Sequence, residues 1–129
     1  MSSIAIIGHN LDIDLLLKKV KLKGYRKAYK GTKINKERTL PYSYISKQLS
    51  PPNEELSVEI RNIIKYLKRH KHQFLVIKEI KEVEYITINF YSDFSMHPES
   101  KIIYSYYFPA NFIGICGELG ISIEFSHYI

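Results

Sequence analysis

The sequence has no tryptophan and only one cysteine among its 129 residues. A single thiol cannot form an internal disulfide, which excludes a scaffold held by disulfides and leads us to expect a reducing compartment. No apolar run approaches the roughly 20 residues that a membrane-spanning helix needs. No basic segment precedes the first apolar stretch, as it would in a signal peptide. We therefore expect a cytoplasmic protein with no membrane-bound part.

Sequence motifs for metals and cofactors are also absent. No phosphate-binding loop, dinucleotide fingerprint or zinc-ligand spacing occurs. His70 and His72 come nearest to a metal-ligand pair. Lys68, Arg69 and Lys71 surround them, and these cations disfavour a divalent metal ion. We expect no metal and no cofactor, and we interpret the two histidines as polar groups near a helix end.

The charge of the chain is uneven. The formal net charge is +6, and residues 18–38 hold ten Lys or Arg and one acid. Residues 82–129 instead hold one Lys and six acids. This asymmetry gives the molecule a positive and a negative side. Eleven tyrosines accompany the charge, and tyrosine is enriched where proteins recognise one another.

Hydrophobic periodicity predicts one α+β domain over residues 1–129. Short β-branched or alternating runs predict strands over 3–8, 42–47, 83–92, 101–108 and 121–129. Apolar spacings of three and four predict helices over 10–20, 50–70, 74–83 and 109–119. Residues 21–41 lack a sustained period, so we expect a long loop with room for a short strand. The elements predict a single mixed or antiparallel sheet with helices packed against it.

Capping residues locate the helix ends. Asp12 is expected to cap the first helix, and Ser50 to cap the second, with a proline at its first position. Gly120 stands where the apolar period changes from 3.6 to 2, which is the place for a left-handed C-terminal cap. Gly114 and Gly117 share a helix face, and we expect that face to pack closely on the sheet.

The single cysteine, Cys116, raises the question of catalysis. A reactive thiolate needs a nearby cation, a base or a helix N-terminus. Cys116 has apolar neighbours and lies toward the C-terminal end of its expected helix, where the dipole opposes a negative charge. We interpret Cys116 as a buried, small apolar side chain with a structural role, like Gly120. We expect no catalytic residue and predict that the protein is not an enzyme.

The basic segment 18–38 suggests a nucleic-acid-binding module as an alternative function. Lysine and arginine hold phosphates while tyrosine stacks on bases. The candidate cations are Lys23, Arg26, Lys27 and Lys30, and the tyrosines beside them are Tyr25, Tyr29 and Tyr42. A solvated basic loop accounts for the same residues. No helix-turn-helix, RRM or KH pattern accompanies them.

The stretch "FPANFIGICGELGISIEFS" (108–126), a helix closed by "ELG" that runs into a terminal strand, resembles a family of small uncharacterised bacterial α/β domains. "SIAIIGHNLDID" near the start and "YKGT" (29–32) fit the same layout. Some members look like immunity proteins, which bind and silence a toxin from a polymorphic or contact-dependent toxin system. The resemblance implies no catalytic residues to carry over.

From this resemblance we expect an immunity protein that occludes the active site of a cognate toxin, with a nuclease as one candidate toxin. The expected contact surface is tyrosine-rich and charged. Its candidate anchors are Tyr104, Tyr106 and Tyr107 in the predicted strand 101–108. The net charge of +6 departs from the acidic immunity proteins that match a basic nuclease cleft, so we expect steric occlusion rather than mimicry of nucleic acid.

Overall fold

A computed structural model describes residues 1–93 and 106–128 of the chain. Five strands in these residues form one sheet with the order β2-β3-β1-β4-β5. The strands are β1 (Ser2–Gly8), β2 (Arg26–Ala28), β3 (Ser43–Ser50), β4 (Tyr85–Asp93) and β5 (Ser122–Tyr128). The helices are α1 (Ile13–Lys19), α2 (Leu56–Arg69), α3 (Lys71–Lys78) and α4 (Ala110–Glu118).

The sheet is mixed. The central strand β1 pairs antiparallel with β3 and with β4, and β2 pairs antiparallel with β3. Among the pairs of the described strands, β4–β5 alone is parallel, because the connection through α4 returns the chain to the end of the sheet at which β4 begins. The predicted α+β class, a mixed sheet with helices packed against it, is confirmed.

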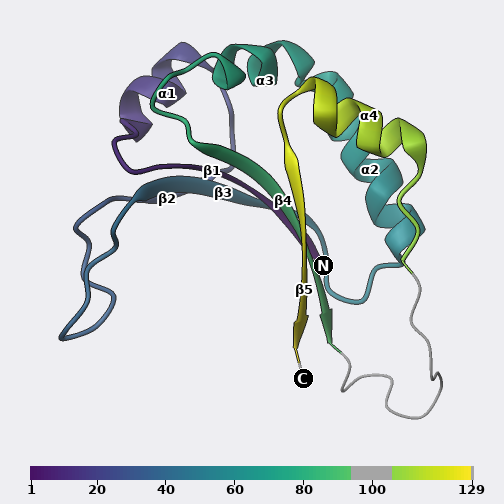
Figure 1. Cartoon of the computed structure of the whole chain (residues 1–129), viewed down its shortest axis with the longest axis horizontal. Helices are drawn as coiled ribbons and strands as arrows, with labels where there is room; N and C mark the ends of the chain where they lie inside the picture. The colour runs from purple at the N-terminus through teal and green to yellow at the C-terminus, as the bar shows by residue number, and fades with distance from the viewer. Residues whose placement is uncertain (94–105, 129) are drawn as a thin grey trace.

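All four helices lie on the same face of the sheet (Figure 1). That face contributes Ile4 and Ile6 from β1, Ile45 from β3, and Ile86, Ile88 and Phe90 from β4 to the core. The helices add Leu16, Ile60, Ile63, Leu67, Phe74, Ile77 and Phe112. Each such side chain stabilises the fold by about 1.5–3 kcal/mol relative to an exposed one. None of the helices in 1–93 and 106–128 combines the length and apolar character needed to cross a membrane.

The predicted start of the second helix is wrong. Ser50 is the last residue of β3, and its hydroxyl shares a 2.6 Å hydrogen bond with the hydroxyl of Ser2. The helix α2 begins at Leu56 after Glu55, whose side chain makes no capping hydrogen bond. Pairing with β1 extends β3 to Ser50, so the prolines that follow lie in a connection instead of the first helical turn.

The structure differs from two other expectations. Residues 106–108 belong to no strand, and the rest of the predicted strand 101–108 lies outside the described residues. Gly114 and Gly117 do not pack on the sheet: both are exposed, and a Cβ at either position would meet nothing within 4 Å. The apolar face of α4 is the opposite one, with Phe112, Ile115 and Cys116.

Candidate functional site

The face of the sheet opposite the helices is covered by no helix of the described chain (Figure 1). The strand registers identify its residues, because directly paired residues share a face. One row contains Ala28, Tyr44, Ile7 and Tyr85. The second row contains Arg26, Ser46, Ala5, Thr87 and Ser122. The third row contains Gln48, Ser3, Asn89 and Glu124. Tyr91 and Ser126 form a fourth. We call these residues the open face.

The open face carries few charges. The residues named above carry two charges, Arg26 on β2 and Glu124 on β5, at opposite edges of the sheet. The next register pair, Asp93 with Tyr128, continues the same alternation at the end of β4 and β5 and adds an acid there. Small side chains occupy the centre, and each residue of the four rows is exposed or half-buried. Ser126 donates a 3.1 Å hydrogen bond to the amide oxygen of Asn89, which ties β4 to β5 on this face.

Aromatic side chains gather at one end of the open face. Tyr85 is 59% exposed. The rings of Tyr42 and Tyr44 lie 5.9 Å apart, and the ring of His9 contacts Tyr42 edge-on at 6.2 Å. The His9 Nδ1 atom lies 2.8 Å from a carboxylate oxygen of Glu84. That contact lowers the pKa of the Glu84 carboxyl and holds the His9 ring beside Tyr42.

The tyrosines predicted as anchors do not lie on the open face in the described chain. Tyr104 falls outside the described residues. The Tyr106 ring packs against Phe125 at a centroid distance of 4.1 Å, on the side of the sheet that the helices cover. Tyr107 is 78% exposed and lies beside the start of α2. There it helps to line a shallow cavity of about 350 Å³ with Leu56, Ser57, Ile60 and Pro109.

The predicted phosphate-binding cations do not form one patch. Arg26 lies on the open face, because it pairs with Ser46. The adjacent Lys27 points to the helix side, where its ammonium lies 3.9 Å from the carboxylate of Asp14. Lys23 is exposed, and its carbonyl accepts a hydrogen bond from the side chain of Lys47 at 3.2 Å. Strand alternation therefore separates cations that are close in sequence.

Lys30 belongs to a projecting hairpin, residues 29–42, which we call the arm. The arm joins β2 to β3 and extends past the sheet, on the side away from the helices (Figure 1). The backbone N–H of Lys30 donates to the hydroxyl of Ser43 at 2.9 Å, and the Tyr29 hydroxyl donates to Asp14 at 3.0 Å. These contacts fix the base of the arm.

The tyrosines of the basic segment are engaged within the fold. The hydroxyls of Tyr25 and Tyr66 share a 2.5 Å hydrogen bond, and the ammonium of Lys47 lies 5.8 Å and 5.5 Å from the centres of their rings. Burial raises the pKa of both phenols, with the neighbouring phenol adding to the effect on Tyr25. Tyr25 is therefore packed between the sheet and α2 and is not presented for base stacking.

Cys116 and Gly120 occupy structural positions at the end of α4. Cys116 is 1% exposed, and burial raises the pKa of its thiol to about 12, so the thiol stays protonated at neutral pH. Gly120 has a φ of 69°, the left-handed conformation expected for it. The Ile121 N–H donates to the Cys116 carbonyl at 2.8 Å, which closes the helix as a Schellman cap does.

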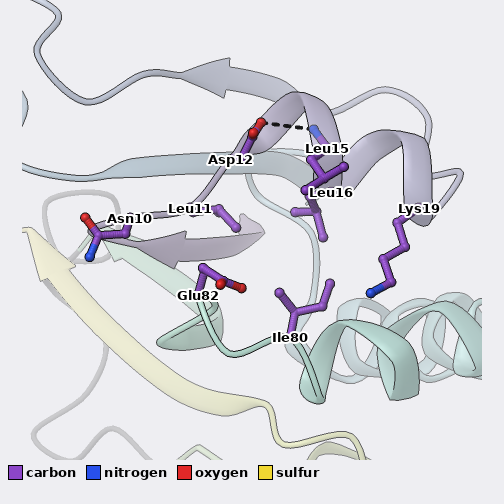
Figure 2. A pocket seen from close by; sticks show the side chains of 8 residues that line it. All are labelled: Asn10, Leu11, Asp12, Leu15, Leu16, Lys19, Ile80 and Glu82. Carbon is purple, nitrogen blue, oxygen red and sulfur yellow. Dashed lines mark hydrogen bonds between the residues drawn. The ribbon is translucent and has the colours of Figure 1, made fainter.

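A groove between α1 and the segment joining α3 to β4 is the other concave feature of interest (Figure 2). Its volume is about 250 Å³, and its lining residues are Asn10, Leu11, Asp12, Leu15, Leu16, Lys19, Ile80 and Glu82. All of its polar side chains are exposed, and Asp12 is occupied in capping α1 through a 3.1 Å bond from the Leu15 N–H. The groove has no buried polar group that would orient a small ligand. The described residues also contain no cluster of three metal-ligating side chains.

The sequence interpretation missed Tyr44, Tyr85 and Tyr91 as surface candidates. A signal for them was present, because Tyr85, Thr87, Asn89 and Tyr91 alternate with the apolar residues of the same strand. Such alternation predicts a strand with one polar face. It does not say whether another element covers that face.

No family model matches this chain, and no curated protein or solved structure matches it.

Proposed function

We propose that this protein binds another protein through the open face of its sheet. The observation that carries the proposal is the composition of that face, which has tyrosines, small neutral side chains and few charges. Arg26 and Glu124 lie at the two edges of the sheet, and Asp93 is in the last register pair of β4 and β5. Protein interfaces share two features of this face, because aromatic residues are enriched and charged residues depleted in them. A nucleic-acid surface needs cations along the path of the strand instead.

We propose a toxin as the partner and an immunity function as the consequence. This step is supported by the resemblance of residues 108–126 to domains found among immunity proteins. A protein seated on a toxin through this sheet face blocks access to the toxin's active site without needing a catalytic residue. The protonated, buried thiol of Cys116 fits a binding protein in the same way.

The test pairs the chain with the protein encoded by its neighbouring gene. Co-expression of both should restore growth that the neighbour alone inhibits, and the two proteins should co-purify. Tyr85→Ala should weaken the complex at least tenfold, since truncating a buried aromatic anchor of an interface costs about 2 kcal/mol or more. Leu75→Ala, a change on the exposed side of α3, is the control and should leave binding and rescue intact. Equal rescue by both variants would contradict an open-face interface.

Nucleic-acid binding is the second candidate, and the arm is the observation that favours it. The arm carries Lys30, Lys33, Lys36 and Arg38 against the single acid Glu37. Tight, salt-dependent binding of RNA or DNA by the whole chain, lost when arm cations are removed, would support this candidate. The neutral open face beside the arm makes protein binding the better supported function.

A further inference from the structure

The area of the open face is too small for a complete interface. Five strands about 4.8 Å apart, with about six residues each at roughly 3.3 Å, span on the order of 500 Å². A stable protein–protein interface usually buries about 800 Å² on each partner. A partner seated on the open face must therefore contact surface beside it as well, and the arm projects on that side of the sheet (Figure 1).

The arm is an ordered hairpin that adds nothing to the core. The Gly31 N–H donates to the Leu40 carbonyl at 2.9 Å, and the Leu40 N–H donates to the Thr32 carbonyl at 2.8 Å. At the tip, the side-chain oxygen of Asn35 accepts from the N–H groups of Glu37 and Arg38, both at 2.9 Å. Every residue from 29 to 39 is nonetheless exposed. Its internal hydrogen bonds thus shape a segment that packs against no other described element beyond its base.

The chemistry of the arm is that of a binding segment. Its four cations and one acid give a local charge of +3 (4 − 1). Ile34 lies near the tip and is 59% exposed, in contact with water that an apolar side chain avoids. The surface that complements the arm is negatively charged around an apolar spot. Arg26 extends the positive charge from the base of the arm onto the open face.

We propose that the arm clasps an acidic surface of the protein that covers the open face, with Ile34 buried at the contact and the arm cations facing carboxylates around it. The inference rests on the proposed function for the presence of a protein partner. It adds the chemistry of that partner: an acidic surface, which differs from the basic cleft of a nuclease. The interface is then a neutral, tyrosine-bearing sheet face with a basic hairpin along one side.

A crosslinking step identifies the partner and its contact. A photoreactive benzophenone side chain is placed at position 34 on the arm, at 85 on the open face, and at 113 on the exposed side of α4 as a control. Positions 34 and 85 should capture the same protein, and the peptide captured from 34 should be rich in Asp and Glu. Position 113 should not capture it. Capture from 85 without capture from 34 overturns the arm proposal and leaves the proposed function standing.

A kinetic step with the purified partner tests the charge. Lys33→Glu with Arg38→Glu should slow association about tenfold or more at low salt, flatten its salt dependence and change dissociation little. Lys65→Glu with Lys68→Glu, two exposed positions on α2, makes the same change in net charge and should alter association less than twofold. Ile34→Ser should speed dissociation. If the two charge reversals slowed association equally, the arm would have no specific contact with the partner and the proposal would be overturned.

The remaining outcome concerns nucleic acid. A 20-nucleotide polyuridine RNA and a 20-base-pair DNA serve as probes for the unmodified chain. We expect weak binding to both probes. The charge reversal on the arm and the charge reversal on α2 should reduce this binding equally. Strong binding that only the arm reversal abolishes, with no protein captured from 34 or 85, would overturn both the arm proposal and the proposed function.

Discussion

Hydrogen bonds of single side chains decide which tyrosines are presented to a partner. Tyr25 and Tyr29 lie in the basic segment, yet their hydroxyls bond to Tyr66 and Asp14. Tyr85 follows no basic run and is 59% exposed on the open face. Proximity to cations in sequence is therefore a poor guide to a binding tyrosine in this chain, because contacts within the fold engage the hydroxyls of Tyr25 and Tyr29.

Cys116 gives a prediction about pH. The fold raises its thiol pKa to about 12, whereas a thiol in the unfolded chain ionises near 8.5. As pH rises above about 8.5 the unfolded chain loses this proton first, so the thiol costs the fold stability, by about 1–2 kcal/mol at pH 10. Urea unfolding of the parent and of Cys116→Ala from pH 7 to pH 10 measures the effect. The stability difference between them should shift in favour of the alanine variant, and a constant difference would contradict the shifted pKa.

Gly8 gives a prediction about close packing. A Cβ at position 8 would lie 2.0 Å from the carbonyl oxygen of Glu82, which is backbone and cannot swing away. Gly8→Ala should destabilise the fold by about 1–3 kcal/mol, as overpacking does. Gly114→Ala is the matched control, since a Cβ there meets nothing and alanine is the better helix former. The control should be neutral or stabilising by up to about 1 kcal/mol, and a harmless Gly8→Ala would show that the strand end can move.

At the level of elements, periodicity predicted the helices and strands better than local capping signals did. The stripe of α2 and the alternation of β4 depend on many residues, and both elements formed. The start of α2 depended on Ser50 and the two prolines after it, and pairing of β3 with β1 overrode that signal. The cap predicted at Gly120 formed with a positive φ, whereas the close packing predicted for Gly114 and Gly117 did not form.

The junction of α4 and β5 gives a prediction about the backbone conformation of Gly120. Gly120→Val should destabilise the fold by about 1–3 kcal/mol, because a β-branched residue resists a φ of 69°. The Lys78 side chain, 3.3 Å from a Cβ at this position, is flexible enough to move aside, so backbone strain is the main cost. Gly120→Asn should lose less, since asparagine tolerates the left-handed region better. Thermal melting of both variants measures the order, and equal losses would point to crowding rather than strain.

For the whole molecule, the sequence predicted an α+β sheet but not its uncovered side. The predicted strands 83–92 and 121–129 each showed a polar and an apolar face in their alternation. Whether helices cover both faces depends on the side of the sheet over which the connections run. All four helices of the described chain lie over one side (Figure 1). The arm was expected as a basic loop within 21–41. Its projection beside the open face follows from the pairing of β2 with β3, which joins segments that no periodic pattern relates.

The fold distributes the basic residues of the chain over several elements. The basic segment 18–38 divides among α1, both sides of β2 and the arm. Additional cations lie at the end of α2. Positive charge therefore surrounds the open face on the β2 side without covering it. This arrangement leads us to expect charge to control how fast a partner arrives, and the neutral face to control how long it stays.

The central claim is that the open face contacts the partner protein. The most direct measurement compares capture of the same partner by a benzophenone at position 85, on the open face, and at position 75, on the exposed side of α3, in the cells that produce the chain. We predict strong capture from 85 and background capture from 75. Capture from 75 alone, or from neither position while the complex still co-purifies, would contradict the open face as the binding surface.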